Sequence, residues 1–294
     1  MSRPADPTVV RSVTAASVGP VLAYLEGHLD TSIFLLSCLT MFGPELGTDG
    51  RSGNYRTIEG ADGVSAVWSL TRRGHLLAQT GGRTDFTDVI LGSSASDPVR
   101  ICGVVAEWQL ADALWRALTP RAAFARTYAA KSTVYALDLA DAPASAHGGV
   151  EVRVLNGTDF GAWDALNIDF AAEEGAPIAG NVDGRRRYFE ACAASGQCWG
   201  GFDGDALVTM AALDHDYAWA AQVGGIFTRP DRRGRGFART ILTRVLNDLR
   251  DRGYTRAVLF GYEREAARRL YEYVGFRPTG HFGMFYGMWQ KADG

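Results

Sequence analysis

The sequence predicts an α+β protein made of two units that share one order of elements, each a mostly antiparallel central sheet flanked by helices. A stretch rich in Pro, Ala, Ser and Gly at 138–149 has no apolar periodicity and separates two strand-like runs. On each side of it, two helical segments are followed by alternating strand-like runs and then by helices and strands in turn. We therefore expect domains at 1–140 and 150–294, joined by a linker at 141–149.

The first unit opens with two helical patterns and continues with short apolar runs. Apolar residues recur at helical spacing in 18–28 and 32–42, and again in 108–118. Short runs rich in β-branched and aromatic residues, bounded by Gly, Asp or Ser, are typical of strands. The expected strands are 55–59, 64–70, 75–79, 100–105 and 133–139.

The second unit has better-marked elements. After a strand at 150–155 and helices at 159–171 and 185–194, the strands 198–202, 207–213 and 219–228 alternate around turn signals at 203–205 and 214–216. From Phe237 the apolar residues follow the 3.6-residue period up to Leu249, and Gly253 stands where a helix C-cap belongs. We expect a buried strand at 257–260, a helix ending at Gly275 and a last strand at 281–289 that closes this sheet.

The composition argues against several classes of function, namely binding of nucleic acids, metals and membranes. Of 294 residues, 47% are hydrophobic and 21% charged, and the formal net charge is −3, so the bulk charge does not indicate a nucleic-acid partner. The four cysteines lie far apart without a metal-ligand spacing, and we expect reduced thiols and no metal. The N-terminal residues do not form a signal segment and no run approaches the length of a membrane span. We therefore expect a cytoplasmic protein that does not bind a membrane.

The strongest local signal is the segment 226–238, in which a strand enters a Pro-Asp turn and then an Arg-Gly-x-Gly-x-Ala sequence opens a helix. A helix N-terminus leaves backbone N–H groups unpaired and carries the positive end of the helix dipole, so it attracts a phosphate. Gly234 and Gly236 let the main chain turn and let an anion approach, and three arginines add positive charge. A plain strand-to-helix connection is the alternative for this glycine turn.

At this point the sequence resembles the GCN5-related N-acetyltransferases (GNAT superfamily), of the tandem-domain type with a degenerate N-terminal domain. The acyl-CoA signature Arg/Gln-x-x-Gly-x-Gly/Ala is met by Arg233, Gly236 and Ala238. A second signature, Ala-x-x-Leu-Tyr-x-x-x-Gly-Phe, is met by residues on the next helix. Those residues are Ala267, Leu270, Tyr271, Gly275 and Phe276. The family's cofactor-contacting asparagine is replaced by Arg264.

The resemblance implies an acyl-CoA-dependent N-acyltransferase, most simply an N-acetyltransferase that uses acetyl-CoA and a primary amine of a small molecule or protein. The amine would attack the thioester directly in a ternary complex, and Tyr271 would protonate the leaving thiolate as general acid. Core packing is the alternative role for this tyrosine. The implied cofactor-binding residues are Ile226, Phe227, Thr228, Arg233, Gly234, Arg235, Gly236, Phe237, Ala238 and Arg264.

The general base is less defined. Relatives often carry a glutamate on the strand before the cofactor loop, but 218–228 contains no carboxylate. Glu263 is the base candidate that we carry forward. Other candidates are Asp214, His215, Asp216, Glu173, Glu174, His281 and a chain of waters, and for each carboxylate a solvated loop charge is the alternative.

The N-terminal half lacks the Arg-Gly-x-Gly sequence where the repeat would place it. Thr80, Gly81, Gly82 and Arg83 follow the strand 75–79, but two aspartates come directly after them. We expect this half to pack against the catalytic half and not to bind CoA. Two alternatives remain: a non-catalytic CoA sensor or scaffold, and an enzyme with a CoA site in each half.

Overall fold

The computed structural model describes residues 9–119, 124–145, 149–176, 178, 180–261 and 264–289. The chain divides into a first compact unit, Met1–Val134 with Gly280–Gly294, and a second, Tyr135–Thr279. The linker was expected after residue 140, whereas the division falls earlier, inside a long strand. Residues 281–289, expected to close the second sheet, belong instead to the first unit.

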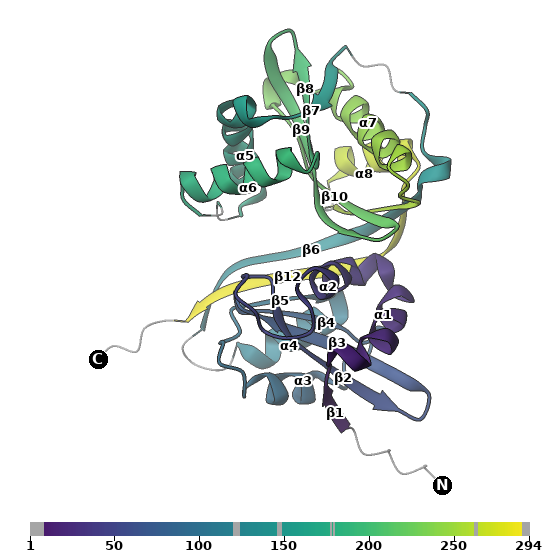
Figure 1. Ribbon diagram of the computed structural model, residues 1–294. Helices are drawn as coiled ribbons and strands as arrows, with labels where there is room; N and C mark the ends of the chain where they lie inside the picture. Colours follow the sequence, from purple (N-terminus) through teal and green to yellow (C-terminus); the bar gives the residue numbers. More distant parts are fainter. Residues whose placement is uncertain are drawn as a thin grey trace, which may run out of the picture. The chain divides into compact units, whose positions relative to one another are not determined.

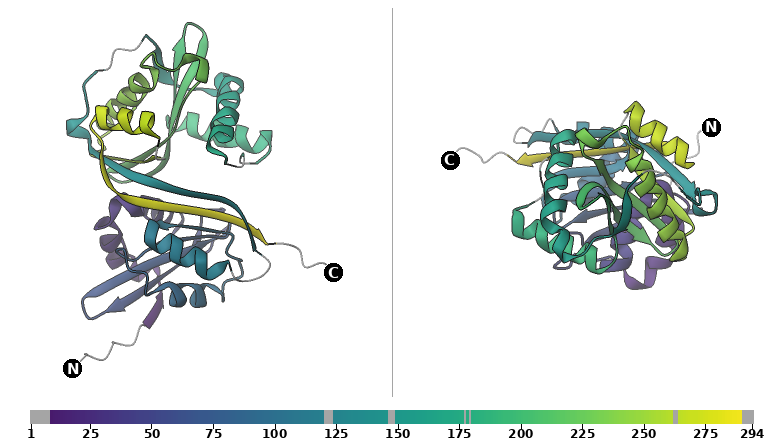
Figure 2. Two further views of the ribbon diagram at one scale, coloured as in Figure 1. Left: turned by 180° about the vertical axis from the view of Figure 1, so that it is seen from behind. Right: turned by 90° about the horizontal axis from the view of Figure 1, so that it is seen from above.

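The first unit contains a sheet with the strand order β1-β2-β3-β4-β5-β12-β6. Its described pairings are antiparallel, apart from the parallel pair β4 and β5. Helices α1 and α2 cover one face and α3 and α4 the other (Figures 1 and 2). The elements are β1 (Val9–Ser12), η1 (Ala15–Ser17), α1 (Val18–Glu26), α2 (Leu29–Phe42), β2 (Gly53–Gly60), β3 (Gly63–Thr71), β4 (His75–Gln79), α3 (Thr87–Ser94), β5 (Gly103–Glu107), α4 (Trp108–Leu118), and most of β6 (Phe124–Asp138) and β12 (Arg277–Trp289).

The second unit repeats this plan. Its strand order is β6-β11-β10-β9-β8-β7, with β10 and β11 as the parallel pair among the described pairings. Helices α5 and α6 lie on one face of the sheet and α7 and α8 on the other (Figures 1 and 2). The elements are η2 (Leu139–Asp141), β7 (Glu151–Val154), η3 (Gly157–Asp159), α5 (Phe160–Glu174), α6 (Val182–Ala194), β8 (Cys198–Asp203), β9 (Ala206–Tyr217), β10 (Ala220–Thr228), η4 (Pro230–Arg232), α7 (Phe237–Asp251), β11 (Arg256–Gly261) and α8 (Glu265–Val274).

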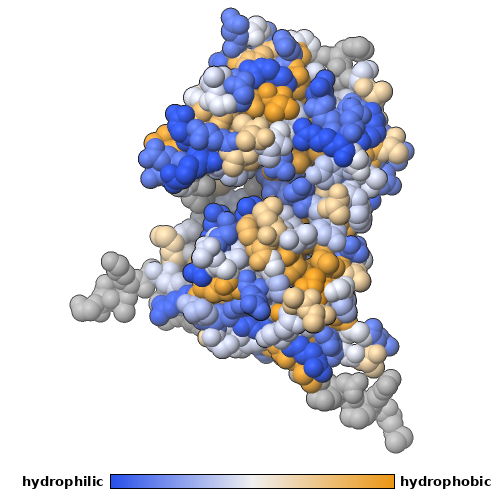
Figure 3. All heavy atoms as spheres, viewed as in Figure 1, coloured by the Kyte–Doolittle hydropathy of each residue, from blue (hydrophilic) through white to orange (hydrophobic). Residues whose placement is uncertain are grey.

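The α+β class and the duplicated, mostly antiparallel plan are confirmed. The helix that the 3.6-residue period predicted is α7, whose apolar stripe is fully buried against the sheet at Ile241, Val245 and Leu249. On the opposite face of the sheet, α5 and α6 bury a second cluster around Trp163 and Phe189. The space-filling view shows mostly hydrophilic residues over the outer surface of α7, as expected for its exposed stripe (Figure 3).

One expected turn is wrong. Residues 214–216 were expected to turn between two strands, but they lie inside β9, where His215 pairs with Gln222 and Asp216 pairs with Ala221. The chain reverses at Ala218, which has a φ of 41°. The segment Asp214–His215–Asp216 has the composition of a turn. Pairing with β10 nevertheless extends the strand β9 through these three residues. The carboxyl groups of this segment are therefore carried by a strand.

The last strand also differs from the expectation. β12 pairs antiparallel with β5, from Phe282 opposite Glu107 to Tyr286 opposite Gly103. Hydrophobic alternation in 281–289 identified the strand but could not identify the partner, because pairing depends on residues far away in the sequence. In the first unit this strand buries Phe282 and Phe285.

Candidate active site

The two parallel strands of the second unit part at the middle of the sheet. β10 pairs with β11 from Ala220 to Gln222, and beyond that point the described residues show no further pairing between these strands. β10 also carries a bulge, since Gly224 pairs with Ala212 and the next pair joins Phe227 to Met210. Gly225 has a φ of +58° at the bulge, a conformation that favours glycine. The edge of β10 that faces β11 is thus left open over its second half.

The loop after β10 leads into α7 through two glycines in the left-handed region. Gly234 has a φ of +76°, and Gly236, the N-cap of α7, has a φ of +83°. Thr240 donates a backbone hydrogen bond to the carbonyl of Gly236 at 3.0 Å, so the amides of the preceding helical residues have no carbonyl one turn earlier within α7. These amides form the positive end of a four-turn amphipathic helix.

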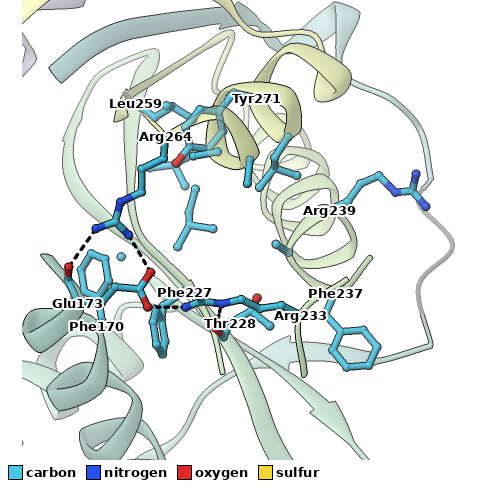
Figure 4. A pocket seen from close by; sticks show the side chains of 18 of the residues that line it. Phe170, Glu173, Phe227, Thr228, Arg233, Phe237, Arg239, Leu259, Arg264 and Tyr271 are labelled. Atoms are coloured by element: carbon cyan, nitrogen blue, oxygen red, sulfur yellow. Dashed lines mark hydrogen bonds and ion pairs between the residues drawn. The ribbon is translucent and has the colours of Figure 1, made fainter. Parts of the chain in front are cut away.

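A cavity of about 420 Å³ occupies the space between the parted strands. Its lining brings the open half of β10 and the α7 N-terminus together with the last turn of α5 and the first turns of α8 (Figure 4). Among the residues predicted to bind a cofactor, nine line it: Ile226, Phe227, Thr228, Arg233, Gly234, Gly236, Phe237, Ala238 and Arg264. Arg235 is not in the lining; its guanidinium lies 3.9 Å from the carboxylate of Asp203.

Glu173 joins two arginines that approach from different elements (Figure 4). Arg233 donates to Glu173 Oε2 at 2.6 Å, and Arg264 donates to Glu173 Oε1 at 2.7 Å and to its backbone carbonyl at 2.9 Å. Hydrogen bonding from Arg233, together with the charges of both guanidinium groups, holds the pKa of Glu173 below its usual range. This carboxylate therefore stays ionised and occupied, and is poorly suited to accept a proton.

Glu174 has the opposite environment although it is the next residue. Its Oε1 lies 3.2 Å from Arg264 and its side chain is 9% exposed. Burial raises the pKa of Glu174, while the charge of Arg264 opposes the rise. The sequence did not distinguish the environments of these two glutamates. Arg264 pairs with both carboxylates, whereas Arg233 pairs with Glu173.

Tyr271 lines the cavity from α8. Its ring packs against Tyr135 at a centroid distance of 5.3 Å, and a Cβ on Gly261 would contact it. Burial, followed by the negative charge of Glu174, raises the pKa of Tyr271 to about 12. A phenol in this setting keeps its proton at neutral pH and can donate it.

Among the base candidates, Glu263 lies outside the described residues, so its role stays a prediction. His281 belongs to the segment of β12 in the first unit. Asp216 accepts a hydrogen bond from the hydroxyl of Tyr254 at 2.9 Å. Asp214 is solvent-exposed on β9, with its carboxylate against Gly224.

In the first unit, side chains of β4 and β5 lie against the glycine-containing loop that follows β4. The buried Gln79 accepts a hydrogen bond from the amide of Gly81 at 2.8 Å and donates to Thr31 and Ser32. A Cβ on Gly82 would lie 3.4 Å from the carboxylate of Glu107. One loop amide is thus already paired, and a carboxyl group lies where a phosphate would meet repulsion.

Comparisons with known proteins agree with this architecture. Residues 165–276 match the model of the Acetyltransferase (GNAT) family. This segment is a GNAT domain. It contains the last ten residues of α5, the helices α6 to α8 and the strands β8 to β11, and therefore every residue that lines the cavity between the parted strands. No curated protein matches the chain.

Solved structures extend the likeness of fold beyond the GNAT domain to nearly the whole chain. A Drosophila protein, 12% identical, has a TM-score of 0.71, with 96% of this chain and 99% of that protein covered. A GCN5-related N-acetyltransferase from Sphaerobacter thermophilus, 17% identical, covers 95% of each chain with a TM-score of 0.55. A tandem GNAT protein from the clavulanic acid biosynthesis pathway, 12% identical, covers 97% of this chain and 99% of that protein with a TM-score of 0.55.

The described residues contain no group of three or more His, Cys, Asp or Glu side chains placed to hold a metal ion. None of the helices in the described part of the chain is both long and apolar enough to cross a membrane.

Proposed function

We propose that the second unit is an acyl-CoA-dependent N-acyltransferase that transfers acetyl from acetyl-CoA to a primary amine. The observation that carries the proposal is the cavity that runs from the α7 N-terminus, between β10 and β11, to the buried hydroxyl of Tyr271. It combines an anion site, an open strand edge and an acid in one channel.

The residues present fit the parts of acetyl-CoA. The first amides of α7 and the guanidinium of Arg233 would hold the diphosphate, because a helix N-terminus and an arginine both satisfy phosphate oxygens. The open edge of β10 at Ile226–Thr228 would pair with the amides of the pantetheine arm in the manner of an added strand. Acetyl-CoA supplies the thioester, whose thiolate is the leaving group.

The reaction would proceed by direct attack in a ternary complex. A neutral amine forms the C–N bond at the thioester carbonyl, the C–S bond breaks, and Tyr271 donates its proton to the sulfur. Its pKa of about 12 favours the protonated phenol throughout the neutral range. No covalent intermediate on the chain is required.

Binding is proposed for the second unit alone. In the first unit, Gln79 already occupies the amide of Gly81, and the carboxyl group of Glu107 lies beside Gly82. A calorimetric titration of acetyl-CoA into the full chain should therefore give one site per chain. Two sites would contradict this assignment.

The decisive variant for the anion site is Gly236→Glu. It would place a negative side chain at a residue with a φ of +83°, where the loop meets the first amides of α7. Acetyl-CoA binding should be lost, whereas Gly204→Glu, in the β8–β9 turn with open space around it, should bind as the wild type does. Normal binding by the Gly236 variant would refute the diphosphate site.

The alternative, a CoA-binding protein without catalysis, predicts the same titration but no release of free CoA in the presence of any amine. Turnover with one amine excludes it.

A further inference from the structure

Next to the cavity, the second unit contains a polar cluster that the cofactor site does not use. It lies on the face of the sheet that α6 covers, where Asp214 interacts with Tyr188 on α6 and Cys198 on β8. Its members are Asp214 on β9 and Gln222 and Gly224 on β10. We propose that Asp214 and Gln222 form the subsite for the ammonium group of the acceptor and that Asp214 is the general base. This inference rests on the proposed function.

Asp214 lies directly beside the bulge. A Cβ on Gly224 would overlap the Asp214 carboxylate, so the carboxylate occupies space that is free because residue 224 is a glycine. Gly224 also lines the cavity. The carboxylate therefore contacts the stretch of main chain that borders the cavity where the strands have just parted.

The cluster presents hydrogen-bond acceptors to a ligand. Gln222 is 6% exposed, and its Nε2 donates to Asp214 Oδ2 at 3.4 Å. Its Oε1 is buried without a hydrogen-bond partner among the described residues, which is costly for a polar atom. A carboxylate and an amide oxygen are matched by a ligand that has only N–H donors. A protonated primary amine is such a ligand.

Asp214 is also able to change its protonation state near neutral pH. Its surface is open to solvent, but surrounding protein reduces its hydration and raises the pKa to about 6, against the hydrogen bond from Gln222. Titratable groups near it include His215 and Asp216 on β9, Tyr188 and Cys192 on α6 and Cys198 on β8. Burial raises the pKa of Tyr188, and the hydrogen bond with Cys192, followed by burial, raises the pKa of Cys198. Within the described part of the chain, the hydrogen bond from Gln222 is the one interaction that lowers the pKa of this carboxyl group of Asp214, and no cation adds to it.

The other carboxylates near the cavity are less suited. Glu173 is bound by two arginines, and Glu174 lies 3.2 Å from Arg264. Asp216 is engaged by the hydroxyl of Tyr254. Asp214 combines solvent access with contact at the bulge, and among the described residues no arginine pairs with it.

The protons balance in the following way. The ammonium group gives one proton to Asp214, and the neutral amine attacks the thioester carbonyl. As the C–N bond forms and the C–S bond breaks, the sulfur takes the proton of Tyr271, and the nitrogen loses its second proton, which restores the phenol through water. Asp214 releases its proton to solvent. The net products are the amide, free CoA and one proton.

The test compares two kinds of amine with the full-length protein and acetyl-CoA, and measures free thiol release. Hydroxylamine is neutral at pH 7.5 and needs no base, whereas a panel of alkylamines (cadaverine, spermidine, glucosamine and benzylamine) is protonated or partly so. We expect Asp214→Asn to reduce kcat/KM for the best panel amine by about 10²–10⁴-fold at pH 7.5. It should leave hydroxylamine turnover and the acetyl-CoA Kd within about twofold, and the loss should diminish toward pH 9.5.

The matched control is Asp216→Asn, two residues further along β9, which should leave all three quantities near their wild-type values. Gln222→Leu should raise KM for the panel amine more than it lowers kcat. An equal loss with hydroxylamine and alkylamines, no loss at all, or no alkylamine turnover by a wild type that does turn over hydroxylamine would each overturn the inference. Failure to bind acetyl-CoA would instead refute the proposed function.

Discussion

Replacing Glu173 by Gln should strengthen the binding of acetyl-CoA. Glu173 binds the guanidinium groups of Arg233 and Arg264, both of which are predicted to bind the cofactor. The side chains of both arginines are 44% exposed and that of Glu173 is 30% exposed, so each ion pair is of the solvent-screened kind. Such a pair contributes about 0.2–1 kcal/mol.

Two such pairs amount to about 0.4–2 kcal/mol of free energy that the cofactor must replace when it binds these arginines. Since 1.4 kcal/mol corresponds to a tenfold change in Kd, removing the carboxylate should tighten acetyl-CoA binding by about two- to thirtyfold. The assay is isothermal titration at low and at physiological salt, and the gain should shrink as salt screens the charges.

Glu190→Gln is the control for this experiment, because Glu190 pairs with Arg186 at 3.9 Å on α6 and is not part of the cavity lining. Its Kd should equal that of the wild type. If Glu173→Gln binds acetyl-CoA more weakly, Glu173 holds the two arginines in position for the cofactor and does not compete with it, and the reasoning fails.

Three further outcomes are expected. Tyr271→Phe should lower kcat by about 10²–10⁴-fold with an unchanged acetyl-CoA Kd. Because the pKa of Tyr271 is about 12, deprotonation of this residue should not reduce wild-type activity between pH 7 and 10. Full turnover by the variant would exclude the general-acid role. Asp214→Asn should raise Tm at pH 8, because the pKa of this carboxyl group is about 6 in the folded state and lower in the unfolded chain. Such a group stabilises the fold below pH 4 and loses that contribution as the pH rises through 6. The Tm values of wild type and variant should therefore converge near pH 4, and a lower Tm of the variant at pH 8 would contradict this sign. Leu246→Ala, which empties a fully buried position of α7, should cost about 2–5 kcal/mol of unfolding free energy in urea titrations, and a loss under 1 kcal/mol would show that α7 repacks.

Local chemistry explains what the sequence predicted correctly. The period that buries Ile241, Val245 and Leu249 is a property of α7 alone, and the Gly-x-Gly turn before it reports a backbone conformation that few other residues adopt. Those signals identified the helix and nine of the residues that line the cavity.

The missed features depend on contacts between distant residues. Asp214 was weighed as a loop charge because its neighbours have a turn-like composition, but pairing with β10 places it in a strand beside Gly224. The opposite settings of Glu173 and Glu174 depend on burial and on Arg233, which lies 60 residues after Glu173 in the chain and hydrogen-bonds that carboxylate. The short helix α3, with apolar residues at only a few positions, offered too little periodicity to be predicted.

The assignment of β12 to the first unit has a consequence for the order in which the protein can form. Residues 280–289 are synthesised after the whole of the second unit, yet they supply the strand that pairs with β5. Translation therefore exposes β5 with an unpaired edge for the time needed to make about 170 further residues, and such an edge can recruit strands of other chains. The first unit can therefore be completed only after the second unit has been synthesised.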